Sequence, residues 1–183
     1  MINIYKLRLT ILQQEIMRLF FIKAGESLNA RAIAKLLDVS QPAVAKALPF
    51  LAKEGLIIVE QDKESKRWAI ELNRDNKVVI GLKRADNLKQ LYECGLVQSI
   101  YDNFPSATVI LFGSYALGED TNKSDIDLAV IDAEKKGIDE KFNKILERTI
   151  NINYYKSFKS IDKLLLENIL NGITLKGAIE LER

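Results

Sequence analysis

The sequence predicts an α+β protein with two domains joined by a helix. Apolar residues recur at helical spacing through the first 54 residues, and two short strand-like runs follow them. A polar break comes next at residues 73–77, and the second half alternates apolar strand-like runs with helical stretches. We therefore expect a first domain over residues 1–77, a linking helix over 78–104, and a second domain with a small mixed sheet over 105–183.

The composition of the chain excludes several classes of protein and of catalytic site. The chain is 48% hydrophobic and 28% charged, which is the balance of an ordinary globular protein. No apolar run approaches the roughly 20 residues that span a bilayer. The N-terminus lacks the features of a signal peptide, so we expect a cytoplasmic protein with no membrane partner. Because the chain has no histidine and one cysteine, Ser-His-Asp triads, His-containing zinc sites and an internal disulfide are excluded.

Capping residues mark the helices of the first domain. Asn29 and Ser40 each precede a run with helical spacing, and Gly55 follows the last helix. Pro42 falls in the first turn of its helix, where proline is tolerated. The expected helices cover residues 7–21, 30–37 and 41–54, and the expected strands cover residues 56–60 and 68–72.

This order of three helices and a hairpin resembles the winged helix-turn-helix of bacterial and archaeal transcription regulators. The resemblance rests on ARAIAKLLDVSQPAVAKALPFLAKEGLI for the helix-turn-helix and on VEQDKESKRWAIEL for the wing. It implies that the third helix lies in the major groove of double-stranded DNA and that the wing contacts phosphates. The implied DNA-binding residues are Ser40, Gln41, Ala43 and Lys46 on the helix, and Lys63, Lys66 and Arg67 on the wing.

The charge of the first half permits DNA binding without requiring it. Residues 1–80 hold 13 Lys and Arg against 9 Asp and Glu, a net charge of +4, whereas residues 81–183 carry −2. The alternative is a module that only packs against a partner protein. Pro49, deep in the third helix, removes a backbone hydrogen bond and predicts a kink. Winged helices commonly pair to read two half-sites, so we expect a homodimer.

The second half contains one segment with a clear chemical signature. A predicted strand over residues 107–112 leads into Gly113 and Ser114, and about a dozen residues later a second strand carries Asp125 and Asp127. Because side chains alternate along a strand, both carboxylates face the same side. Two acids on one face suit Mg²⁺, which takes oxygen ligands and shares its shell with substrate phosphates.

The pattern GSYALGEDTNKSDIDLAV resembles the nucleotidyltransferase domain of the DNA polymerase beta superfamily in its minimal form, over residues 105–177. The resemblance implies that Asp125 and Asp127 are catalytic and hold Mg²⁺, and that Gly113 and Ser114 bind the phosphates of an NTP, for which we expect ATP. Ser124 steadies the loop or the nucleotide. The implied reaction transfers a nucleotidyl group to an acceptor and releases pyrophosphate.

Active members of that superfamily carry a third carboxylate on a later strand, which this sequence lacks. The corresponding strand is expected over residues 149–155, where counting back from the GITL turn places Asn153 in the metal-ligand position. Asn151 is the other candidate on the same face, and Glu147 is the nearest acid. An amide oxygen can coordinate a cation but cannot take a proton.

Two main functions therefore compete. The first is a magnesium-dependent nucleotidyltransferase with a DNA-binding domain, acting on an unknown acceptor. The alternative is a DNA-binding transcription regulator or toxin-antitoxin component, whose second domain binds nucleotide but is catalytically impaired by the replacement of the third acid. In a toxin-antitoxin pair, the chain would modify or mask a partner protein.

Overall fold

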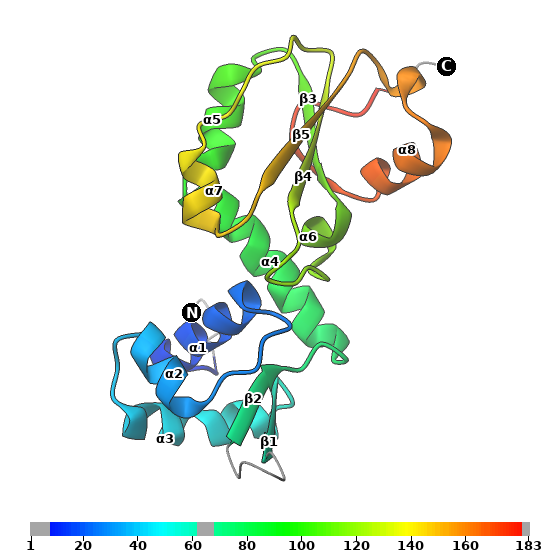
Figure 1. Ribbon diagram of the computed structural model, residues 1–183. Coiled ribbons are helices and arrows are strands. Elements are labelled where there is room, and N and C mark those ends of the chain that lie inside the picture. Colours follow the sequence, from blue (N-terminus) through cyan, green and yellow to red (C-terminus); the bar gives the residue numbers. More distant parts are fainter. Residues whose placement is uncertain (1–7, 62–67, 181–183) are drawn as a thin grey trace, which may run out of the picture. The chain divides into compact units, whose positions relative to one another are not determined.

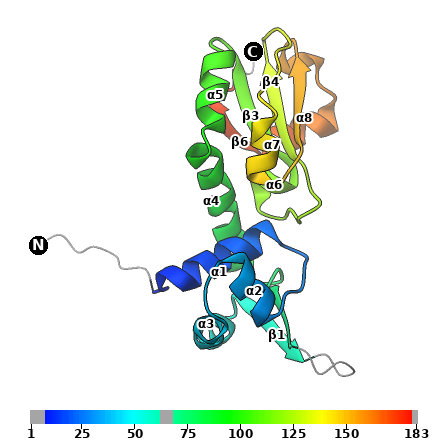
Figure 2. The same cartoon turned by 60° about the vertical axis from the view of Figure 1, so that its left-hand side comes forward.

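The computed structural model describes residues 8–61 and 68–180, and the chain divides into two compact units, Met1–Val79 and Ile80–Arg183. Figures 1 and 2 show the elements of each unit from two directions. No helix in the described ranges is long and apolar enough to cross a bilayer.

The N-terminal unit has the predicted order of three helices and a hairpin. Thr10, Asn29 and Ser40 each cap a helix by accepting a hydrogen bond from a backbone N–H of the first turn. Helix α3 continues through Pro49. The elements are α1 (Ile11–Ile22), α2 (Ala30–Leu36), α3 (Gln41–Lys53), β1 (Ile57–Gln61) and β2 (Trp68–Leu72).

A single apolar core holds this unit together. Buried side chains from all three helices and both strands pack in it, including Ile16, Ile33 and Leu51, which have no exposed surface. The strands pair antiparallel, and Leu28 exchanges two backbone hydrogen bonds with Ile70 of β2. The hairpin is thereby fixed to the chain between α1 and α2.

The expected linking helix is interrupted. It forms α4 (Lys77–Glu93) and α5 (Leu96–Asn103), with Gly95 between them in the left-handed conformation at φ 83°. A residue with positive φ cannot continue a right-handed helix, and glycine adopts that conformation without steric cost. The expectation of one continuous helix over 78–104 is therefore wrong at Gly95.

The C-terminal unit is built on a four-stranded mixed sheet with strand order β5-β4-β3-β6. Strand β4 pairs antiparallel with β3 and parallel with β5, and β6 pairs antiparallel with β3. The strands are β3 (Thr108–Phe112), β4 (Ile126–Ile131), β5 (Ile150–Tyr155) and β6 (Ile173–Lys176), and the helices are α6 (Gly113–Leu117), α7 (Lys141–Leu146), the 3₁₀ turn η1 (Phe158–Ser160) and α8 (Lys163–Leu170).

Alternation along β4 separates two cores. Ile126, Leu128 and Val130 face a cluster that contains side chains of α5 and α7, whereas Ala129 and Ile131 face a cluster with α8. Figure 1 shows α5 and α7 on one side of the sheet and α8 on the other. Every residue of β3 and β4 is buried except Thr108 at the start of β3 and Asp127, the second residue of β4.

Candidate functional site

Asp125, directly before β4, and Asp127, the second residue of β4, face the same side. Asp125 is exposed and Asp127 is half-buried, with the buried Ile126 between them. The side-chain amide of Asn151 donates a hydrogen bond to Asp125 Oδ2 at 3.1 Å and another to Asp127 Oδ1 at 3.2 Å. Because one amide nitrogen reaches both carboxylates, their oxygens converge on a common point.

The Gly-Ser turn lies against the same carboxylates. Phe112, the last residue of β3, pairs with Asp127, so Gly113 follows immediately beside it. Gly113 has φ 75°, and a Cβ placed on it would lie 3.0 Å from Asp127 Oδ2. Glycine therefore permits both the backbone conformation and the close approach of the turn to the acid.

Asn151, and not Asn153, is the residue beside the two acids. The parallel ladder pairs Asp127 with Asn151 and Ala129 with Asn153, so the register expected from the sequence is corrected by two residues. Asn153 lies on the same face, one alternation further along β5. The parallel alignment of β5 on β4 places Asn151 beside the acids, and counting residues back from the C-terminal turn does not reveal this alignment.

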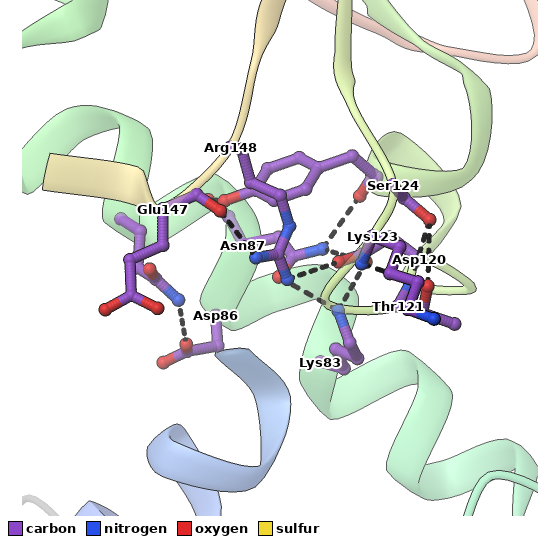
Figure 3. A network of polar contacts seen from close by, with 11 residues as sticks. Lys83, Asp86, Asn87, Asp120, Thr121, Lys123, Ser124, Glu147 and Arg148 are labelled. Atoms are coloured by element: carbon purple, nitrogen blue, oxygen red, sulfur yellow. Dashed lines mark hydrogen bonds and ion pairs between the residues drawn. The ribbon is translucent and has the colours of Figure 1, made fainter. Parts of the chain in front are cut away.

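Glu147 does not replace the missing acid in this arrangement. It is the exposed residue that ends α7, with φ 51° in the left-handed region, and it precedes β5. Figure 3 shows its carboxylate turned away from the polar cluster around Asp120. The position opposite Asp127 belongs to Asn151.

Ser124 bonds the loop that precedes the two acids. Its hydroxyl accepts a hydrogen bond from the Thr121 N–H at 3.0 Å, and its own N–H donates to the Thr121 carbonyl at 3.0 Å. These reciprocal bonds close a tight turn directly before Asp125. Of the two roles expected for Ser124, the contacts correspond to steadying the loop.

The residues present suit one divalent cation. Two converging carboxylates supply the negative charge and the oxygen atoms that Mg²⁺ requires, and an amide turned by half a rotation would add the Asn151 oxygen. Within the ranges that the structure describes, no group of three or more His, Cys, Asp or Glu side chains is arranged for a metal ion. The charge of a third acid, which a second cation would require, is therefore missing from the site.

Tyr155 belongs to the same face of β5 as Asn151 and Asn153. Burial raises the pKa of its phenol, and the negative charge of Asp127 raises it further. The phenol therefore releases its proton only at a higher pH than an unperturbed tyrosine does.

Asp125, Asp127 and Asn151 do not line either of two cavities on the C-terminal unit. These cavities have volumes of about 440 Å³ and 530 Å³. The first is lined by Ile150, Ile152 and Tyr154, whose side chains alternate to the face opposite Asn151, and the second lies beside Asp132 and Lys156.

The expected DNA-contacting residues of the helix lie in the first turns of α3. Gln41 and Lys46 are exposed, and Ala43 is half-buried. Ser40 accepts a hydrogen bond from the Ala43 N–H at 3.3 Å and so caps the helix. The expected wing residues Lys63, Lys66 and Arg67 lie outside the described residues.

Sequence reasoning missed a buried polar cluster next to the site. Asp120, in the loop after α6, contacts Lys83, Asn87 and Arg148, and all four are buried (Figure 3). Burial lowers the pKa of Lys83, an effect that Asp120 opposes. Lys83, Asn87 and Gln90 recur at helical spacing on a buried face of α4, and this periodicity of polar residues was the available signal.

Comparisons with known proteins agree with both halves of this description. Residues 96–178 match the family model described as polymerase beta, nucleotidyltransferase, and residues 11–68 match the model of the MarR family. No curated protein matches the sequence.

Several solved structures resemble parts of the chain. The adhesin competence repressor AdcR of Streptococcus pyogenes is 21% identical, with a TM-score of 0.43 over 57% of this chain and 72% of its own. MepR of S. aureus, solved in a complex with DNA, is 22% identical with a TM-score of 0.37, over 51% and 80%. A toxin-antitoxin structure with AMP-PNP is 26% identical with a TM-score of 0.36, over 47% and 73%.

The two family matches cover separate segments, and the order of elements agrees with each. Three capped helices and a hairpin account for the first match, and the mixed sheet with the Gly113 turn beside Asp127 accounts for the second. The chain therefore joins an N-terminal winged-helix domain of the MarR type to a C-terminal nucleotidyltransferase domain of the polymerase beta type.

Proposed function

We propose that this chain is a DNA-binding regulator whose C-terminal domain binds one Mg²⁺ ion and a nucleoside triphosphate, with ATP the expected nucleotide. The observation that carries the proposal is the convergence of Asp125 and Asp127 beside the Gly113 turn, with Asn151 in the third position. The acids would hold the cation, and the turn would approach the phosphates. When bound, Mg²⁺ would neutralise phosphate charge and bridge it to the acids.

Binding without efficient transfer fits this chain better than turnover. Transfer to a hydroxyl acceptor needs a group that takes the acceptor proton, and a neutral amide cannot serve. Asn151 occupies the place next to both acids, and no third carboxylate joins them among the described residues. Magnesium-dependent transfer to an acceptor is the outcome that would overturn this part of the proposal.

The winged helix supplies the proposed DNA contact. The exposed Gln41 and Lys46 of α3 present a base-reading amide and a phosphate-binding cation. The match to the MarR family supports double-stranded DNA as the partner, and a homodimer would read two half-sites. A toxin-antitoxin partner protein is the remaining alternative.

The nucleotide site is tested by calorimetric titration of the full chain with ATP in the presence of Mg²⁺. We expect saturable binding that requires the cation and is abolished in Asp125→Asn. Glu167→Gln, an exposed acid on α8, is the charge-matched control and should bind as the wild type does. Absence of binding by the wild-type chain to any of the four NTPs would refute the proposal.

Turnover is tested separately with α-labelled ATP, Mg²⁺ and DNA, RNA or protein acceptors. We expect no stable label and no pyrophosphate release above the background of Asp125→Asn. Label that depends on Asp125 would show that the chain is a transferase despite Asn151.

A further inference from the structure

The cluster around Asp120 joins the segments that carry the candidate site. Asp120 lies in the loop between α6 and β4, and its side chain has no exposed surface. It forms a salt bridge with Lys83 of α4, accepts a hydrogen bond from Asn87 Nδ2 at 2.7 Å, and lies 3.6 Å from Arg148 Nη2 (Figure 3).

Two partners of Asp120, Asn87 and Arg148, are tied to residues next to the site. Asn87 Nδ2 also donates to the carbonyl of Tyr115 at 2.9 Å, and Tyr115 directly follows Ser114. Arg148 stands three residues before Asn151, at the entrance to β5. The carbonyl of the next residue, Thr149, accepts the N–H of Ile126 at 2.8 Å. One buried carboxylate therefore connects the Gly-Ser turn, the loop and β5.

The charges of the cluster make the Asp120 carboxylate indispensable to it. Lys83 and Arg148 bring two buried cations, and Asp120 is the carboxylate that contacts both. An amide in its place would keep the shape but leave both cations without that negative charge in a poorly solvated setting. The loop would then lose its ion pairs with Lys83 of α4 and with Arg148 before β5.

The chain on either side of Asp120 has little freedom to move. Gly118 adopts φ 78°, and a Cβ placed on it would lie 2.5 Å from the Ile80 carbonyl, so this turn is pressed against α4. On the other side, the reciprocal Thr121–Ser124 bonds close the turn that ends at Asp125. A displacement of Asp120 would therefore be passed along a short, rigid connection to Asp125.

We propose that Asp120 is a positioning residue, which through Lys83, Asn87 and Arg148 fixes Asp125 relative to Asp127 and the Gly113 turn so that the site can hold a cation with its nucleotide. This inference rests on the proposed nucleotide binding. A core ion pair with no influence on the site is the opposing interpretation, and the experiment separates the two.

The first measurement is the dissociation constant for Mn²⁺ with ATP, by electron paramagnetic resonance of free Mn²⁺, together with the urea midpoint of unfolding. Asp120→Asn should weaken Mn²⁺–ATP binding by about 10-fold to 100-fold in protein that is still folded. Leu175→Ala, a buried position on β6, should lower the urea midpoint while leaving the dissociation constant unchanged. Unchanged binding in folded Asp120→Asn would overturn the proposal.

A double variant separates positioning from stability. Lys83→Met with Asp120→Asn removes one charge of each sign and so preserves the net buried charge of the wild type. Its urea midpoint should recover towards the wild-type value, whereas binding should stay weak because the loop is no longer attached. Recovery of binding together with stability would assign Asp120 a purely structural role.

A second readout does not depend on the ligand. Amide hydrogen exchange at Ser124 and Ile126 should accelerate in Asp120→Asn, whereas exchange at Leu166 on α8 should stay as in the wild type. If the wild-type chain fails to bind Mn²⁺ and ATP, the proposed function fails, and exchange alone decides the positioning role. Unchanged exchange at Ser124 and Ile126 would reject that role whatever the binding result.

Discussion

Asn151 lies directly opposite Asp127 in the parallel β4–β5 ladder and donates a hydrogen bond to its carboxylate at 3.2 Å. Replacing Asn151 by Asp would put a third carboxylate against the first two. Without a cation the three negative charges would repel, so the free energy of unfolding at low salt should fall. With Mn²⁺ present, affinity should rise by about tenfold or more, or about 1.4 kcal/mol, and a second ion should bind. Equilibrium dialysis with Mn²⁺ measures the affinity and the number of ions bound.

Asn153→Asp is the matched control for the expected gain in Mn²⁺ binding. It makes the same chemical change two residues along the same face, opposite Ala129 instead of Asp127. We expect little change in Mn²⁺ stoichiometry. If Asn153→Asp gained the second ion and Asn151→Asp did not, the observed register would be the wrong guide to the site.

Gly113→Ala should damage both stability and binding. The methyl group would lie 3.0 Å from Asp127 Oδ2, at a backbone φ of 75° that alanine rarely adopts. A strained residue of this kind costs about 1–3 kcal/mol, and relief of the clash would move the carboxylate. Urea denaturation and ATP titration in the presence of Mg²⁺ should show both losses.

Gly81→Ala provides the contrast for that prediction. Gly81 lies in α4, and a Cβ added to it would meet no atom within 4 Å beyond its neighbours and the backbone of its own helix, so alanine should raise the free energy of unfolding by about 0.5–1 kcal/mol. Nucleotide affinity should not change. Equal losses in the two variants would contradict a specific role for the Gly113 turn.

Lys46→Ala should weaken binding to duplex DNA and lower the salt dependence of binding by about one unit of log–log slope. The exposed Lys46 lies in the first half of α3, where a helix in the major groove meets phosphates. Lys53→Ala removes the same charge from the last residue of α3 and should change the slope less. Fluorescence anisotropy across a salt series distinguishes the two, and identical slopes would argue against this docking of α3.

Tyr115 should make the folded protein lose stability at alkaline pH. Burial, and then the Asp120 carboxylate, raise the pKa of its phenol above the ordinary value of 10.0. The unfolded chain therefore releases this proton near pH 10 while the folded protein keeps it. The stabilisation is complete below pH 10 and is lost above it, at about 1.4 kcal/mol per pH unit for one proton.

Tyr115→Phe should remove this contribution to the pH dependence of stability. At pH 8 the variant should be less stable by about 1 kcal/mol, because the hydroxyl no longer donates to the Asn87 carbonyl. Between pH 10 and 11 it should lose less stability than the wild type. Urea denaturation at each pH provides the comparison, and parallel losses in both proteins would show that Tyr115 does not carry the alkaline effect.

The sequence predicted the structure well at positions where a single residue decides the local backbone conformation. Asn29 and Ser40 cap the helices that they were expected to start, and Asp125, directly before β4, lies on the same side as Asp127 of β4, as strand alternation requires. The helix expected over residues 78–104 is divided at Gly95, whose positive φ only the structure revealed.

Register and burial were harder to predict because they depend on partners distant in the chain. Counting residues favoured Asn153, whereas the parallel alignment of β5 on β4 places Asn151 beside the acids. Nothing in the local sequence GED indicates that Asp120 is buried, and in the structure it lies against Lys83, Asn87 and Arg148.

The sequence by itself determined the two-domain order, the glycine turn and the pair of acids, since each follows from the conformational or chemical preference of residues close in the chain. Tertiary structure decided which asparagine meets those acids and how a buried aspartate anchors their loop. Both outcomes depend on pairing between segments more than 20 residues apart, which local preferences do not encode.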